Sequence, residues 1–205
     1  MTQGEAPTKR KRRVYAARVP VEQRRSELLD AALHLVVTAG HTAVTMDAVA
    51  EQAGVTKPVV YGVFGNRAEL LDTLLRREQE QGLSQLAAIR PDPANTDPGD
   101  QIAHILAEFL KAVREAPERW TCIVMPMADM PAQFHAVREE ARERVLRRTE
   151  KLAGELLPKD KAELDPEIVA HTVVTLFEMA ARLVLADPDR YRPERFITAI
   201  RAALA

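Results

Sequence analysis

Lys57 and Tyr61, which can both donate hydrogen bonds to phosphate oxygens, stand four residues apart in the segment 56–64. If this segment is helical, the spacing places both side chains on one face, one turn apart. Lysine and tyrosine are common ligands of the DNA backbone, whereas Val59 and Val60 can only meet thymine methyl groups or pack inward. The segment therefore favours contact with nucleic-acid phosphates and little direct reading of bases.

Two short helices are predicted around these residues. Thr45 is a suitable N-cap for a helix that ends at Gly54, and Thr56 is a suitable N-cap for a second helix. The free backbone amides after each threonine suit a phosphate group. A longer amphipathic helix over 20–39 precedes the pair. This arrangement predicts a helix-turn-helix over 45–64, with its second helix in a major groove.

Basic residues gather near the N-terminus, although the whole chain is almost neutral. It holds 29 Lys and Arg against 30 Asp and Glu. Between Lys9 and Arg25, however, the net charge is +7. Residues 1–19 lack an apolar period and are predicted to form a flexible arm that follows the minor groove; a solubilising tail is the alternative. The arm residues expected to contact DNA are Arg10, Arg12 and Arg13.

Helical patterns continue through the rest of the chain, and an aromatic content of 4% is low for a sheet-rich fold. Three prolines and a glycine interrupt these patterns at 91–99. We therefore predict an all-α fold with an N-terminal three-helix unit and a C-terminal helical unit. The further helices are expected from Asn66 to about residue 90, from 102 to 113, 118 to 130, 131 to 156 and 165 to 186, and from Glu194 onward.

Methionine, aromatic and histidine side chains are candidates for a ligand pocket in the C-terminal unit. Methionine can repack around different shapes, so such a set suits a small hydrophobic or aromatic ligand. Histidine would add polar contacts, and plain core packing is the alternative for each residue. The candidates are His104, Phe109, Trp120, Met125, Met127, Met130, Phe134, His171 and Phe177.

The segment from Ile168 to Phe177 is apolar nearly all round, which a helix can satisfy only if two of its faces are covered. One face can pack on its own domain and the other on a second copy of the chain. Together with the apolar stripe of the last helix, this predicts an intersubunit four-helix bundle; a wholly intramolecular core is the alternative. The expected interface residues are Val173, Val174, Phe196, Ile197, Ile200 and Leu204.

Residues 45–71, TMDAVAEQAGVTKPVVYGVFGNRAELL, resemble the DNA-binding signature of the tetracycline-repressor (TetR) family of bacterial transcription regulators. The resemblance implies a homodimer that binds a palindromic double-stranded DNA operator, and a C-terminal helical domain for ligand binding and dimerisation. It favours a repressor that a hydrophobic small molecule releases. Gly62 departs from the larger polar or aromatic residue frequent in the family, so no base contact is expected there. The resemblance places Thr45, Thr56, Lys57 and Tyr61 on phosphate-contacting positions and Arg67 on a basic position of the next helix.

The expected organisation has four parts, and ligand binding is expected to change the spacing of the DNA-binding units in the dimer. Successive major grooves on one face lie about 34–36 Å apart, so a wrong separation weakens binding. Coupling is expected to pass through the connecting helix. The parts are the basic arm at 1–19, the helix-turn-helix DNA-binding domain at 20–65, the connecting helix at 66–90 and the ligand-binding and dimerisation domain at 91–205.

An enzyme and a helical scaffold protein are the alternative classes. We expect no enzyme, because metalloprotease, phosphate-loop and nucleophile-elbow motifs are missing from the sequence. We also expect no metal and no cofactor, and the single cysteine, Cys122, has no resolving partner. A scaffold would leave Lys57 and Tyr61 unexplained, although Tyr61 could instead pack in a core. Without a continuous run of 18 apolar residues, we expect no membrane partner and a cytoplasmic location.

Overall fold

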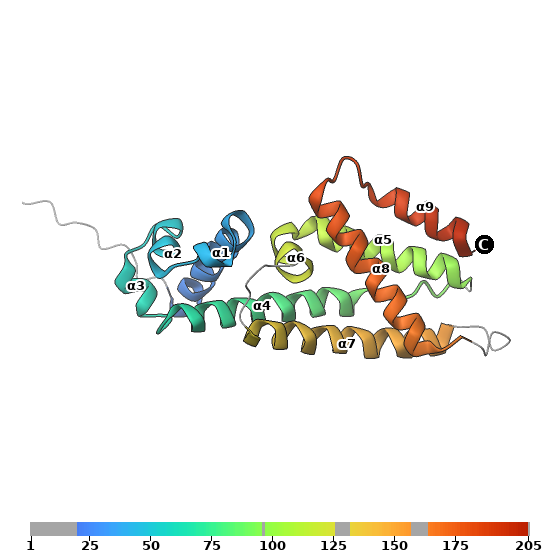
Figure 1. Ribbon diagram of the computed structural model, residues 1–205, viewed down its shortest axis with the longest axis horizontal. Coiled ribbons are helices and arrows are strands. Elements are labelled where there is room, and N and C mark those ends of the chain that lie inside the picture. The colour runs from blue at the N-terminus through green and yellow to red at the C-terminus, as the bar shows by residue number, and fades with distance from the viewer. Residues whose placement is uncertain (1–19, 96, 126–131, 157–163, 205) are drawn as a thin grey trace, which may run out of the picture.

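The computed structural model describes residues 20–95, 97–125, 132–156 and 164–204, and every regular element within these ranges is a helix (Figure 1). The predicted all-α class is therefore confirmed. The elements are α1 (Val21–Ala39), the 3-10 turn η1 (His41–Ala43), α2 (Met46–Gln52), α3 (Lys57–Tyr61), α4 (Arg67–Ala88), α5 (Pro98–Glu115), α6 (Pro117–Val124), α7 (Ala132–Leu156), α8 (Pro166–Ala186) and α9 (Pro193–Leu204).

Helices α1, α2 and α3 form a small unit at one end of the molecule (Figure 1). Its core surrounds Phe64, which is fully buried together with Leu28 of α1 and Leu70 of α4. The turn between α2 and α3 passes through Gly54, whose φ of +64° lies in the left-handed region that glycine adopts without strain.

The predicted N-cap at Thr45 and the predicted helix start at Asn66 are confirmed. The Thr45 hydroxyl accepts a hydrogen bond from the Ala48 amide at 3.0 Å, which begins α2. The Asn66 side-chain oxygen accepts one from the Glu69 amide at 2.9 Å, which begins α4. Such local bonds satisfy amides that have no partner inside the helix, so they fix where each helix starts.

Thr56 occupies the N-cap position of α3, but its side chain makes no capping hydrogen bond. The expected side-chain cap is therefore wrong, and the neighbouring residues explain why. Pro58 has no amide hydrogen to donate, and the Val59 amide already donates to the Thr56 backbone oxygen at 2.9 Å. The Thr56 hydroxyl is left exposed and without a capping role.

The turn η1 between α1 and α2 was not predicted from the sequence. Gly40 ends α1 with a φ of +81°. The Arg67 guanidinium of α4 then donates to the carbonyl oxygens of Val44 and His41, at 2.5 and 2.6 Å. Arg67 thus ties the turn to the start of α4.

The larger unit has a second core between α5, α6, α8 and α9. Helix α9 packs on α5, and α8 packs against α5, α6 and α7 (Figure 1). By length and composition alone α8 could cross a membrane, since its mean hydropathy reaches 1.7. The sequence was expected to hold no stretch able to cross a membrane, and α8 qualifies that expectation. A core helix passes the same test, and α8 contacts four other helices here, α5, α6, α7 and α9.

Helix α4 belongs to both units. Its 22 residues extend over about 33 Å. Its first half contributes Leu71 and Leu74 to the core of the small unit, and its second half lies against α6 and α7. At Gly82 the approach of α6 is close, because a Cβ there would lie 2.6 Å from the Ile123 terminal methyl group.

This close approach predicts that Gly82→Ala gains less free energy of unfolding than the same change at an open helical site, since the added methyl group must displace the Ile123 terminal methyl group. Gly154→Ala in α7 is the matched control, because nothing lies within 4 Å of its added Cβ. Alanine is favoured over glycine inside a helix by about 0.5–1 kcal/mol, so the control should gain stability. Urea unfolding followed by circular dichroism measures both variants. Equal gains in the two would contradict the close approach.

Candidate DNA interface and ligand pocket

Helix α3 has an exposed side and a buried side. Thr56 and Lys57 are exposed, Val59 is 37% exposed and Tyr61 is 47% exposed. Val60 is fully buried in the core of the small unit, so its assignment to DNA contact is wrong. Its side chain anchors α3 to the rest of the unit, and the other four residues remain accessible.

The exposed ammonium group of Lys57 is held by Asp47 of α2. The Lys57 nitrogen lies 2.9 Å from the Asp47 carboxylate and 5.9 Å from the centre of the Tyr61 ring. The hydrogen bond to Asp47, and then the charge of that carboxylate, raise the pKa of Lys57. Because exposed ion pairs are worth little, a phosphate group can replace the carboxylate.

The remaining predicted DNA residues have different positions. Thr45 is exposed at the start of α2, and its hydroxyl oxygen is engaged in the cap. Arg67 is half-buried, with its guanidinium bonded to two backbone carbonyls. The structural role of Arg67 was missed by the sequence analysis. Arg10, Arg12 and Arg13 lie outside the described residues.

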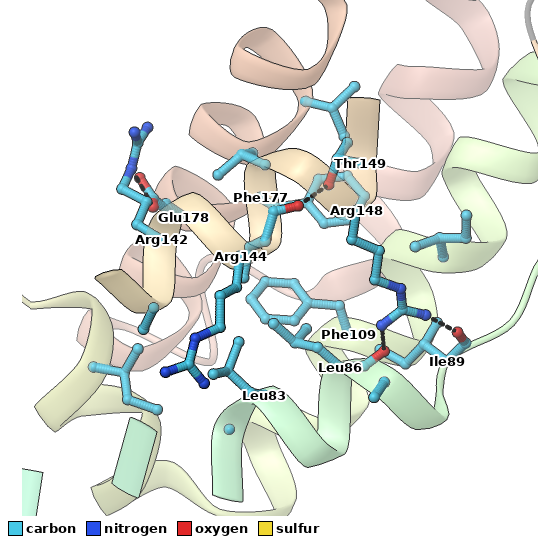
Figure 2. Close-up of a pocket in the computed structure, with 18 of the residues that line it drawn as sticks. Leu83, Leu86, Ile89, Phe109, Arg142, Arg144, Arg148, Thr149, Phe177 and Glu178 are labelled. Atoms are coloured by element: carbon cyan, nitrogen blue, oxygen red, sulfur yellow. Dashed lines mark hydrogen bonds and ion pairs between the residues drawn. The ribbon is translucent and has the colours of Figure 1, made fainter. Parts of the chain in front are cut away.

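A cavity of about 690 Å³ lies in the larger unit, bounded by α4, α5, α7 and α8, with α6 at one end (Figure 2). Phe109 and Phe177 stack in its wall with ring centres 5.7 Å apart. Trp120 meets Phe109 edge to face at 5.1 Å, and its indole nitrogen donates to Gln85 at 3.1 Å. The wall is thus aromatic and apolar over much of its area.

The structure brings together three of the predicted ligand residues, Phe109, Trp120 and Phe177. Four others do not line the cavity, which corrects their assignment. Phe134 belongs to the first core cluster and packs the start of α7 against that core. His171 is exposed beside a separate shallow depression, and His104 and Met125 are half-buried away from the cavity. Met127 and Met130 lie outside the described residues.

Arginines of α7 line the cavity, although a helix face so rich in charge ordinarily lies in solvent. Arg138 and Arg142 are four residues apart, as are Arg144 and Arg148, so these arginines form two rows along α7. The Arg142 guanidinium pairs with Glu178 of α8 at 3.1 Å, and Arg144 lies 3.4 Å from Glu80 of α4. Glu178 therefore pairs with a residue of another helix. The arginines in the lining are Arg138, Arg142, Arg144 and Arg148 from α7, with Arg182 from α8.

Most residues predicted for a dimer interface are covered by their own chain. Val173 and Val174 line the cavity. Ile200 is buried, and its neighbours Phe196 and Ile197 are packed against the same core. The assignments of Val174 and Ile200 are corrected, because both side chains are buried within the chain. Val173, Phe196 and Ile197 are only half-buried and stay predictions. Leu204 is 51% exposed.

Residues 28–74 match the family model of bacterial regulatory proteins of the tetR family. A solved TetR-like transcriptional regulator from Rhodococcus sp. RHA1 is 26% identical, with a TM-score of 0.71, over 90% of this chain and 95% of that chain. The chain carries a DNA-binding domain of the TetR family.

Two curated relatives are similar over a shorter range. The HTH-type transcriptional activator FasR of Mycolicibacterium smegmatis is 40% identical over 67 residues, which are 33% of this chain and 31% of FasR. The HTH-type transcriptional repressor KstR of Rhodococcus jostii is 32% identical over 96 residues, 47% of this chain and 43% of KstR. The chain thus spans less than half the length of each of these relatives.

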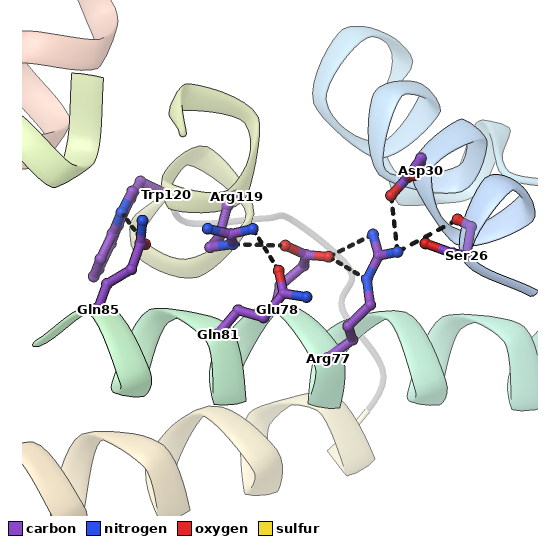
Figure 3. Close-up of polar contacts among 8 residues, drawn as sticks. All are labelled: Ser26, Asp30, Arg77, Glu78, Gln81, Gln85, Arg119 and Trp120. Carbon is purple, nitrogen blue, oxygen red and sulfur yellow. Dashed lines mark hydrogen bonds and ion pairs between the residues drawn. The ribbon is translucent and has the colours of Figure 1, made fainter. Parts of the chain in front are cut away.

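Behind the TetR-family domain, a buried carboxylate connects the two units (Figure 3). Glu78 of α4 is 1% exposed and accepts hydrogen bonds from Arg77 at 2.7 Å and from Arg119 of α6 at 3.1 Å. Arg77 also pairs with Asp30 of α1 at 2.8 Å. The three helices α1, α4 and α6 therefore meet at one charge network, next to the Trp120 end of the cavity.

A second contact joins α1 to α6 directly. The His34 ring lies 2.8 Å from the Glu118 carboxylate, and both side chains are exposed. Helix α6 thus contacts the small unit through Glu118, joins the charge network through Arg119 and lines the cavity through Trp120. Three consecutive residues give this short helix contacts with both halves of the chain.

Cys122 of α6 is buried, and burial raises its pKa to about 12. We expect the native thiol to resist a disulfide reagent at pH 8, because only about one thiol in ten thousand is then ionised. The reaction should become stoichiometric after unfolding in guanidinium chloride, which serves as the control. Rapid labelling of the folded chain would contradict the buried position and would reopen a redox role.

Proposed function

We propose that this chain is a ligand-responsive transcriptional regulator that binds operator DNA through α2 and α3 and acts as a repressor. The observation that carries the proposal is the exposed edge of α3, where Lys57 and Tyr61 lie together on a helix-turn-helix unit of the TetR family. The activity is regulation and not catalysis, in keeping with that family. Its place of action is the cytoplasm, where operator DNA is accessible.

The proposed DNA contacts are mainly to phosphates. Lys57, Tyr61 and Thr56 stand on the accessible edge of α3, and Thr45 marks the amino end of α2, where backbone amides face outward. Val59 is the residue placed to meet a thymine methyl group. Arg67 supports DNA binding indirectly, because its hydrogen bonds fix the turn η1 that precedes α2. The basic arm, with Arg10, Arg12 and Arg13, adds salt-dependent affinity from the minor groove.

We further propose a homodimer formed through the outer face of α8. Ile168 is 61% exposed and Met179 is 39% exposed, although both are large apolar side chains. Thr172 and Thr175 are exposed between them, and the spacing of four, three and four residues keeps all four on one face. A second α8 can cover this face, while the opposite face lines the cavity.

The effector in this proposal is a small hydrophobic molecule in the cavity between α4, α5, α7 and α8. The cavity volume of about 690 Å³ falls within the usual range for small-molecule sites, about 300–1,000 Å³. A solved structure of the same fold, FadR from Bacillus subtilis, is a complex with stearoyl-CoA; it is 13% identical, with a TM-score of 0.64. That structure supports the capacity of this fold to enclose a long apolar group.

Ligand occupancy is coupled to DNA binding through α6 and α4 in this proposal. A ligand that displaces Trp120 or Ile123 moves α6, because both side chains line the cavity. Movement of α6 changes the Arg119 contact with Glu78, and Arg77 carries that change to Asp30 of α1. A ligand with different affinity for the two arrangements shifts the spacing of the DNA-binding units.

The proposed DNA contacts predict different salt responses for two variants. Lys57→Gln should lower affinity and reduce the slope of log affinity against log salt by about 0.9, because one phosphate contact loses its cation. Tyr61→Phe should lower affinity and leave the slope unchanged, since the lost hydroxyl is neutral. Fluorescence anisotropy on duplexes that the full chain selects from a random library measures both.

The control for this experiment is Lys111→Gln on α5, where an exposed lysine also faces a carboxylate, Glu108, at 4.0 Å. Its DNA affinity and salt slope should equal those of the unaltered chain. An unaltered slope for Lys57→Gln would refute the phosphate contact, and failure to select any duplex would refute operator binding. Release of the duplex by a cavity ligand would identify a repressor, and tightening would identify an activator.

The proposed dimer predicts that the double variant Ile168→Glu, Met179→Glu is a monomer. Each α8 would then bury two unpaired carboxylates in the interface with the second copy. Light scattering after size-exclusion chromatography at micromolar concentration measures the mass. Val21→Glu on α1 is the control, since Val21 is 69% exposed on the other unit and should leave the dimer intact. A monomeric mass for the unaltered chain would contradict the dimer.

A further inference from the structure

Arg148 of the cavity wall and Arg90, which lies outside the lining, converge on a single oxygen atom near the carboxyl end of α4. The Arg148 guanidinium donates to the Leu86 carbonyl at 2.5 Å and to the Ile89 carbonyl at 2.8 Å (Figure 2). Arg90 donates to the same Ile89 oxygen at 3.3 Å and also to the Ala87 carbonyl. Two positive charges are thus held side by side at the carboxyl end of α4.

Neither cation has a carboxylate partner within ion-pair distance in the part of the chain that the structure describes. Burial, and then the charge of Arg90, lower the pKa of Arg148. Arg148 is half-buried in the cavity wall and Arg90 is exposed beside it. An anion placed here would relieve the repulsion between the two guanidinium groups and would find donors already in position.

The acidic side chains that line the cavity do not neutralise the positive charge at Arg148 and Arg90. Glu178 is paired with Arg142, and Glu80 lies against Arg144. The third carboxylate of the lining, Glu139, is exposed near the start of α7. It lies nine residues before Arg148, about 13 Å along the helix, so it does not neutralise the cations at the end of α4.

Between the two ends, the wall is apolar. Leu83, Leu86, Phe109 and Phe177 surround the space beside Arg148 (Figure 2). The lining follows α7 from Arg138 to Ala153, a rise of about 22 Å, and Arg148 lies about 15 Å from Arg138 along that helix. This length suits an extended chain better than a compact ring system, and Trp120 and Ile123 of α6 lie at its far end.

We propose that the cavity binds an elongated amphiphile with one oxyanion, whose apolar tail runs toward Trp120 and whose anionic head lies at Arg148 and Arg90. This inference rests on the proposed ligand-binding function and names the chemical class of the ligand. The head is a carboxylate or a phosphate, since both accept the parallel donors of a guanidinium group. The tail end contacts α6, the helix that reaches the small unit through Glu118 and Arg119.

The sole tryptophan of the chain makes the test direct. Trp120 lines the cavity, so its fluorescence reports occupancy without DNA. The probes are laurate, dodecyl phosphate and dodecanol, which share one tail and differ in the head, each used below its micelle-forming concentration. We expect both anions to bind the full chain about ten- to hundredfold more tightly than dodecanol. The order of the two anions distinguishes a carboxylate head from a phosphate head.

Two variants locate the anionic head. Arg90→Gln changes an exposed side chain and should weaken laurate about tenfold, while leaving dodecanol unchanged. Arg148→Gln should weaken laurate by at least as much; because it also removes bonds to the end of α4, its unfolding curve is measured in parallel. The matched control is Arg147→Gln, the next residue on α7, which is exposed and paired with Glu143 at 3.3 Å. It should bind all three probes like the unaltered chain.

Two results would overturn the inference. Equal binding of laurate and dodecanol would remove the requirement for an anion, and loss of laurate binding in Arg138→Gln but not in Arg90→Gln would place the head at the α6 end. Either result leaves the proposed function in place, because an apolar ligand still binds. Loss of fluorescence response to all three probes, with DNA binding unaffected by them, would instead count against a hydrophobic effector.

Discussion

The buried carboxylate of Glu78 constrains how the two halves of this chain meet. A charge that is 1% exposed loses most of its hydration and is tolerated only if charged donors replace the water. Arg77 and Arg119 supply those donors from α4 and α6, and Arg77 is itself held by Asp30 of α1. Removing one partner from such a group typically costs about 3–5 kcal/mol. The relative placement of α1, α4 and α6 is therefore set by chemistry at one point.

The sequence predicted the parts of the structure that local interactions decide. Helix ends at Thr45 and Asn66 follow from bonds between residues three apart, and the break at 91–99 follows from proline and glycine. The exposed edge of α3 could also be predicted, since a residue four positions after Lys57 must share its face. These features depend on spacing along the chain and not on what lies opposite.

Contacts between distant segments could not be predicted in the same way. Arg142 and Arg148 sit on a helix face rich in charge, which ordinarily faces water; only the arrival of α4 and α8 turns that face into a cavity wall. Val174 and Ile200 are apolar, and apolarity alone does not say whether the covering partner is the same chain or another. The buried position of Glu78 depends on Arg119, which lies 41 residues away along the chain.

The pairing of Lys57 with Asp47 has a consequence for the search for an operator. Before DNA arrives, the ammonium group already has a carboxylate at 2.9 Å, so binding to a phosphate exchanges one anion for another. An exchanged partner contributes less net attraction than a newly acquired one. Under the proposed function, Lys57 therefore adds little to the binding of random DNA, and other cations supply most of the nonspecific attraction. Because Asp47 offsets the charge of Lys57, α3 adds little sequence-independent attraction to DNA. A smaller sequence-independent term increases the ratio of operator affinity to random-DNA affinity.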